Sequence, residues 1–210
     1  MKRNKGAFLC ISCYFKGVSF LKAIKNLGHP VFLVTSKSLE NDPWPREHID
    51  EIFYMEEDED GHWNEDHLLA GTAHLMRHHL ISRIVALDDF DVERAALLRE
   101  HFRIPGMGQT TSRHFRDKLA MRVKASEAGI LVPAFSSLFN DAAINAFADE
   151  NPAPWFIKPR GEASATGIHK INSKEHLWSK INELGEQRHQ FLIEGYIPGD
   201  VFHVDSLRFS

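Results

Sequence analysis

Lys158 and the small-residue loop behind it are the residues of this chain best suited to chemistry. The stretch from 155 to 171, WFIKPRGEASATGIHKI, indicates an apolar strand ending near Lys158, a loop from Gly161 to Gly167, and a second strand. Small side chains let backbone N–H groups approach an anion, and glycine tolerates a positive φ. A lysine beside such a loop adds a countercharge. Taken alone, the stretch fits a phosphate-binding loop and an ordinary hairpin equally well.

Two further pairs have spacings that metal sites use. Cys10 and Cys13 form a C-x-x-C pair, but a zinc site needs more ligands at matching spacing, and the sequence has no second pair. We interpret them as two thiols at the end of a buried strand in a reducing cytosol. His74 and His78 are four residues apart on an expected helix with no carboxylate partner beside them, so we expect a solvated face. Neither pair predicts a metal.

Composition limits the class of protein. The chain has 210 residues, 43% of them hydrophobic, which suits a globular protein with one large or two small domains. Its net charge of -4, from 25 basic and 29 acidic residues, predicts no nucleic-acid or membrane partner. No apolar run approaches the roughly 20 residues that cross a bilayer. The basic start is followed by too short an apolar run for a signal peptide, so we expect a cytoplasmic location.

An N-terminal α/β layer is expected to precede the chemistry. Strands are predicted at 7–12, 31–35, 49–55 and 84–87, and helices at 18–27, 66–79 and 92–101. Strand, helix and strand in close succession imply parallel pairing, so the pattern predicts a doubly wound sheet that ends near Gly108. Asp88 and Asp89 are interpreted as carboxylates at a helix start. The first loop, 13–17, lacks G-x-G-x-x-G, so no nicotinamide cofactor is expected.

The second half places the loop between further elements. Thr111 or Ser112 is expected to cap one helix that runs to Gly129, on which Lys118 by itself suggests only a surface lysine. Strands are predicted at 132–138, 191–194 and 201–207, and helices at 141–150 and 173–184. The lysine and its loop therefore lie within an α+β region.

Four pieces in one order resemble the ATP-grasp superfamily of carboxylate ligases. They are Arg116 to Leu119 with Gly129 and Pro133 behind it, Lys158 to Gly161 with the loop to Ile168, Glu194 to Ile197, and Gly199-Asp200 leading to His203-Val204-Asp205. Each piece is weak alone, and their order and spacing make the set specific. The resemblance implies a preATP-grasp domain at 1–108 and, at 109–210, an ATP-grasp lid subdomain with the start of the C-terminal subdomain.

The resemblance also implies roles for particular residues. The expected nucleotide-binding set is Lys118, Lys158, Gly161, Ser164, Gly167, Glu194, Tyr196, Ile197 and Asp200. The two lysines contact the ATP phosphates, and the glycine-bounded loop closes over them. The glutamate and the backbone behind it form a hinge that reads the adenine amino edge, and Asp200 is expected near the ribose hydroxyls.

The magnesium ligands of the superfamily have no counterpart in this sequence. Such enzymes bind Mg²⁺ through a late acidic residue and a Glu-x-Asn motif, which we expect beyond residue 210. The chain is thus expected to be the ATP-binding front part of a ligase, inactive alone, whose parent activates a carboxylate as an acyl phosphate and joins it to an amine. The alternative is a non-catalytic nucleotide-binding or regulatory module completed by a partner chain. A homo-oligomer is compatible with either.

Overall fold

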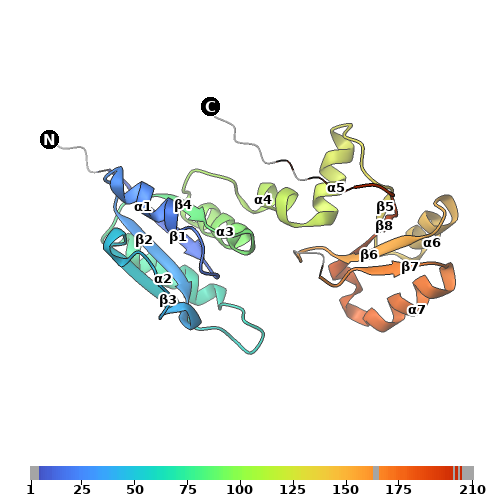
Figure 1. Cartoon of the computed structure of the whole chain (residues 1–210), viewed down its shortest axis with the longest axis horizontal. Coiled ribbons are helices and arrows are strands. Elements are labelled where there is room, and N and C mark those ends of the chain that lie inside the picture. The colour runs from blue at the N-terminus through green and yellow to red at the C-terminus, as the bar shows by residue number, and fades with distance from the viewer. Residues whose placement is uncertain (1–4, 163–165, 201, 203, 205–210) are drawn as a thin grey trace. The chain divides into compact units, whose positions relative to one another are not determined.

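The computed structural model describes residues 5–162, 166–200, 202 and 204 (Figure 1). By its internal contacts the chain divides into two units, Met1–Arg116 and Asp117–Ser210, which are described separately below. No helix of the described residues is both long and apolar enough to cross a membrane.

The first unit is built on a parallel sheet with the strand order β3-β2-β1-β4. Its strands are β1 (Ala7–Ser12), β2 (Val31–Ser36), β3 (Glu51–Met55) and β4 (Ile81–Ala86). The central strand β1 pairs with β2 on one side and with β4 on the other. It is an almost continuous apolar run because helices bury both of its faces.

Helices cover the two faces of this sheet. Helix α1 (Val18–Asn26) packs Leu21 into a core with Leu33 and Trp44. On the other face, α2 (Glu65–Met76) and α3 (Val92–Phe102) pack against β1 and β2. The predicted doubly wound parallel sheet is therefore confirmed. The predicted stop of the first helix is confirmed too, since Gly28 follows it with a φ of 81°.

Short 3-10 turns connect several of these elements. They are η1 (Lys37–Leu39), η2 (Arg46–His48), η3 (Asp89–Asp91) and, in the second unit, η4 (Gly185–Gln190). Asp88 caps η3, because its side chain accepts a hydrogen bond from the backbone N–H of Phe90 at 3.0 Å. This agrees with the expected carboxylate at a helix start.

The second unit holds an antiparallel sheet with the strand order β5-β8-β6-β7. Its strands are β5 (Phe135–Ser137), β6 (Trp155–Pro159), β7 (His169–Ile171) and β8 (Phe191–Gly195). Helices α6 (Asp141–Glu150) and α7 (Lys174–Leu184) cover one face, where Trp155, Ile157 and Ile193 meet Ile144 and Leu177. The lysine and loop singled out in the sequence belong to the hairpin formed by β6 and β7.

The prediction of a single helix from Thr111 or Ser112 to Gly129 is wrong. The structure has two helices, α4 (Gln109–Arg116) and α5 (Lys118–Glu127), separated by Asp117 in an extended conformation. The Asp117 carboxylate accepts the backbone N–H of Leu119 at 2.9 Å, which begins a new helix. Phe115 is 63% exposed, so the four-residue apolar spacing did not mark a buried face.

Of two further strand predictions in the second unit, one changes and the other is not tested. The strand expected over 132–138 is confined to the three residues of β5. The strand expected over 201–207 lies largely outside the described residues, together with His203 and Asp205.

Candidate functional site

The face of the second sheet opposite its helices carries the predicted lysine and glutamate. Side chains alternate along a strand, so Trp155 and Ile157 enter the core while Phe156 and Lys158 lie on the other face. Glu194 pairs with Phe156 in the register of β6 and β8 and shares that face. The hairpin and β8 together thus bring two of the predicted site residues into contact.

Glu194 lies between two cations. Its Oε2 is 2.5 Å from Lys158 Nζ, and its Oε1 is 2.6 Å from Nε of Arg122 on α5. The Glu194 side chain is 1% exposed, whereas both cations are 21% exposed. A carboxylate so deeply buried has to be paired, and here it is paired twice. One surplus positive charge therefore remains at the surface of this face.

A second ion pair joins the start of α5 to the end of β6. The Arg160 guanidinium donates to both carboxylate oxygens of Asp117, with Nε 2.9 Å from Oδ1. Arg160 also donates to the backbone carbonyl of His189 at 3.0 Å. Burial by itself raises the pKa of Asp117, but the hydrogen bonds and charge of Arg160 outweigh it and hold that pKa below its ordinary value. This ion pair holds the start of α5 against the end of β6.

Lys118 is held beside the predicted phosphate loop. Its backbone N–H donates to the Arg160 carbonyl at 2.9 Å, and its side-chain ammonium donates to the Glu162 carbonyl. Lys118 and Gly161 are therefore close in space although 43 positions separate Asp117 from Arg160 in the chain. The resemblance had implied this convergence of the two sequence pieces.

The glycines at the two ends of the loop differ in their backbone. Gly167 has a φ of 69°, and a Cβ there would lie 2.8 Å from Pro159 Cγ, so only glycine fits without strain. A Cβ on Gly161 would meet nothing within 4 Å. Ser164 lies outside the described residues.

The predicted hinge, Glu194 to Ile197, begins in the last two residues of β8. The backbone N–H groups of Gly195 and Tyr196 donate to the carbonyls of Ala134 and Pro154, at 2.8 and 3.1 Å. The Tyr196 ring contacts Phe156 edge-on at 5.6 Å. Ile197 is 62% exposed, and within the described residues its N–H has no acceptor. The hinge therefore offers an apolar side chain and a backbone donor to solvent, and the predicted residue Asp200 behind it is exposed.

Sequence reasoning missed Arg122 and gave no role to Asp117 or Arg160. Arg122 follows Lys118 by four residues, which places both on one side of a helix, and that spacing was the available signal. The pairing of Asp117 with Arg160 joins residues far apart in the chain. Only the folded hairpin brings these two together.

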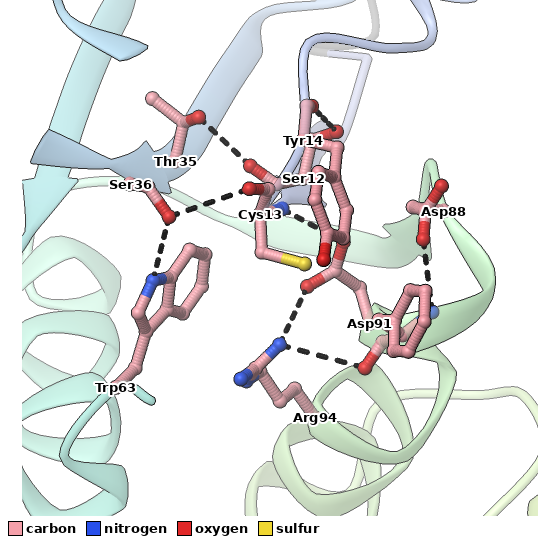
Figure 2. A network of polar contacts seen from close by, with 10 residues as sticks. Ser12, Cys13, Tyr14, Thr35, Ser36, Trp63, Asp88, Asp91 and Arg94 are labelled. Atoms are coloured by element: carbon pink, nitrogen blue, oxygen red, sulfur yellow. Dashed lines mark hydrogen bonds and ion pairs between the residues drawn. The ribbon is translucent and has the colours of Figure 1, made fainter. Parts of the chain in front are cut away.

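A second polar network lies at the carboxyl edge of the first sheet (Figure 2). Cys10 packs in the core on the α1 side, whereas Cys13 packs against the opposite core. Burial raises the pKa of each thiol to about 12. The two cysteines therefore pack in different cores and do not converge on one site. His74 and His78 are both exposed, with ring centroids 5.9 Å apart.

Cys13, Asp88 and Asp91 place one potential metal ligand each within 4.8 Å of one another. Basic side chains of the protein already neutralise the two carboxylates of this cluster. Lys16 pairs with Asp88, and Asp91 accepts the Cys13 N–H at 2.8 Å and Arg94 Nη1 at 3.1 Å. Asp91 is fully buried, and burial raises its pKa in spite of these partners. Asp91 holds Cys13 and Arg94 in place, and the charges of the two carboxylates are balanced by Lys16 and Arg94.

Known proteins that are similar to this chain include ligases and a biotin carboxylase domain. No family model matches the chain. Over 94 residues, 45% of this chain and 31% of the relative, the sequence is 30% identical to a D-alanine--D-alanine ligase of Neisseria gonorrhoeae. It is 29% identical over 130 residues, 59% of this chain and 32% of the relative, to an L-arginine-specific L-amino acid ligase of Bacillus subtilis.

Solved structures match almost the whole chain. An L-amino acid ligase from Bacillus licheniformis matches with a TM-score of 0.66 and 18% identity, over 93% of this chain and 45% of that one. The biotin carboxylase domain of the Hydrogenobacter thermophilus 2-oxoglutarate carboxylase matches with a TM-score of 0.68 and 18% identity, over 90% and 44%. The chain has the fold of the ATP-grasp superfamily. It spans less than half the length of these proteins, and in sequence it resembles D-alanine--D-alanine and L-amino acid ligases.

Proposed function

We propose that the second unit binds ATP on the polar face of its sheet, as part of an ATP-dependent ligase that joins a carboxylate to an amine. The observation that carries the proposal is the buried Glu194 held between Lys158 and Arg122. Two cations around one carboxylate leave a positive charge for a polyphosphate. The ligase names of the relatives support the reaction class.

The residues of this face are suited to separate parts of a nucleotide. Lys158 and Lys118 supply compact positive charges for phosphate oxygens, and the loop beginning at Gly161 supplies backbone N–H groups. Ile197 offers a dry contact for the purine and an N–H that has no acceptor among the described residues, beside the Tyr196 ring. In this proposal Lys158 exchanges Glu194 for phosphate while Arg122 keeps the carboxylate paired. We also propose that the Asp200 carboxylate contacts the ribose hydroxyls of ATP.

ATP supplies the phosphoryl group that activates a carboxylate, and the chain's own residues position and neutralise it. Magnesium is expected with ATP, and the solved biotin carboxylase domain was obtained with MgADP. Among the described residues of the second unit, no three His, Cys, Asp or Glu ligand atoms gather at metal-binding distance. The proposal therefore assigns no residue of this chain to the metal.

Titration with ATP of the wild type and of Lys158→Ala tests the nucleotide site. We expect the substitution to weaken binding by about 1 to 3 kcal/mol, the scale of a lost charged hydrogen bond. The matched control is Lys174→Ala, because Lys174 also forms a single ion pair, with Asp149, but lies on α7. Identical ATP affinities for wild type and Lys158→Ala contradict the phosphate assignment. Release of ADP with a panel of carboxylates and amines tests the ligase step separately.

A further inference from the structure

A groove of about 500 Å³ lies at one edge of the sheet in the second unit. We call it the β5 groove, because β5 and the residues just before it form one wall. The end of α5 and one side of α6 form the others. Most of its lining is apolar or small, including Val132, Phe135, Ala143, Ala146 and Phe147. All of it belongs to the second unit.

The outer edge of β5 has unpaired backbone groups. The strand is first in the order β5-β8-β6-β7, so it pairs only with β8. The Gly195 N–H donates to the Ala134 carbonyl, and Phe135 is the next residue along. Since successive residues of an antiparallel strand direct their backbone groups to opposite edges, those of Phe135 and Ser137 point away from β8. Within the described residues, neither the N–H nor the C=O of Phe135 has a partner.

The wall formed by α6 leaves room for another backbone beside this edge. Ala143, Ala146, Phe147 and Glu150 are three or four residues apart and therefore share one side of the helix. Phe147 is buried in the core, whereas the two alanines are exposed. A paired strand lies about 4.8 Å from its neighbour, and short alanine side chains do not fill that space.

One end of the β5 groove is negative. Glu150 is the charged residue of the lining, and it is the last residue of α6, where the helix dipole adds partial negative charge. Its neighbour Asp149 pairs with Lys174, but none of the ion pairs in the described part of the chain involves Glu150. An exposed, unpaired carboxylate at a helix C-terminus favours a cationic group in the groove.

We propose that the β5 groove binds an extended peptide segment of a partner protein, which adds a strand to β5 and places a lysine or arginine beside Glu150. Backbone hydrogen bonds to the open edge supply affinity, and alternate side chains of the peptide supply specificity. The groove contains none of the residues proposed to bind ATP, so this inference goes beyond the proposed function and is tested without nucleotide.

Selection of random octapeptides displayed on phage tests the groove, with the whole chain immobilised as the target. We expect enriched peptides to have apolar residues at alternate positions and a lysine or arginine. Ala146→Leu fills the groove and is expected to abolish the enrichment. Ala142→Leu is the matched control, because Ala142 is also an exposed alanine of α6 but does not line the groove. Absence of enrichment overturns the proposal, and so does enrichment that Ala146→Leu leaves unchanged.

The most enriched peptide, made synthetically, tests the charge by isothermal titration. Glu150→Lys is expected to weaken its binding at least about tenfold, because a like charge then faces the basic residue. Glu186→Lys is the matched control and is expected to leave binding unchanged, since Glu186 is exposed and lies on η4 outside the groove. Equal affinities for wild type and Glu150→Lys reject the proposed basic residue.

N-methylation of the same peptide tests strand addition. Only every second residue of an added strand donates its N–H to β5. Methyl groups on one alternate set of amides are therefore expected to abolish binding, whereas methyl groups on the other set are tolerated. Equal effects of the two sets contradict strand addition.

Sedimentation of the chain without peptide tests a second copy as the occupant. We expect wild type and Ala146→Leu to have the same mass. A wild-type dimer that Ala146→Leu dissociates would show that a second copy occupies the groove, which overturns the proposed partner.

Discussion

Lys158 and Glu194 form an ion pair across the adjacent antiparallel strands β6 and β8, with Nζ 2.5 Å from Oε2. The same carboxylate binds Arg122 through its other oxygen. Lys158 is therefore able to turn toward an anionic ligand without leaving a buried charge unpaired. Arg122 is therefore a positioning residue for Lys158, because it keeps Glu194 paired when Lys158 turns away.

Replacing Arg122 with methionine is expected to destabilise the protein. Glu194 would keep a single counterion in a buried position, and we expect a loss of about 1 to 3 kcal/mol, less than for a fully buried pair because Arg122 is 21% exposed. Urea denaturation measures the loss. Arg122→Lys, which keeps the charge, is the control and should lose less. Adding Glu194→Gln to Arg122→Met should recover part of the stability, and no recovery would mean that charge is not the cause.

Removing the charge of Asp117 is expected to make stability depend differently on pH. Asp117→Asn keeps an oxygen that can cap α5 but loses the attraction to Arg160, at an expected cost of about 1 kcal/mol at pH 7. The pKa of Asp117 is lowered from its ordinary 3.8, so its contribution is complete above that value and is lost as the pH falls through the lower folded pKa. Urea curves at pH 7 and pH 3 should show the wild-type advantage shrinking. An advantage that stays constant across this range argues against the ion pair.

Cys10 and Cys13 are expected to resist alkylation in the native protein. With pKa values raised to about 12, the thiolate fraction at pH 8 is on the order of 10⁻⁴. Iodoacetamide followed by mass spectrometry should label both cysteines in guanidinium chloride and label neither quickly without it. Rapid native labelling of Cys13, the less buried of the two, would show that its surroundings activate the thiol.

Gly161 and Gly167, which bound the predicted phosphate loop, are expected to respond differently to alanine. Gly167→Ala places a Cβ 2.8 Å from Pro159 Cγ on a backbone with positive φ, so we expect a loss of about 1 kcal/mol or more. Gly161→Ala meets no atom within 4 Å and is the internal control, expected to be near neutral. Thermal unfolding of both variants gives the comparison, and equal losses would contradict the positive φ of Gly167.

The sequence predicted the first unit well because its two central strands, β1 and β2, are buried on both faces. Continuous apolar runs such as Val31–Ser36, separated by an amphipathic helix and Gly28, have few alternative interpretations. The break at Asp117 was missed because Phe115, Leu119 and Val123 continue a helical spacing across it. An exposed apolar residue carries the same periodic signal as a buried one, so periodicity alone could not show where the helix ends.

The candidate site was predictable only where residues follow one another in the chain. Lys158, its loop and the stretch from Glu194 to Ile197 are recognisable as sequence pieces. The contact of Arg122 with Glu194 depends on which side of α5 meets the sheet, and the contact of Asp117 with Arg160 depends on the path of the hairpin. Both are properties of packing between segments distant in sequence.

The strand order of the first sheet has a consequence for synthesis of the chain. Strand β1 occupies a central place, and one of its partners, β2, begins within 24 residues at Val31, whereas the other, β4, begins only at Ile81. Chains grow from the N-terminus at about 5 to 20 residues per second, and long-range pairing is slower than local pairing. During the seconds between synthesis of β2 and synthesis of β4, the edge of β1 that later pairs with β4 is therefore unpaired. A chaperone could bind this edge only during that interval.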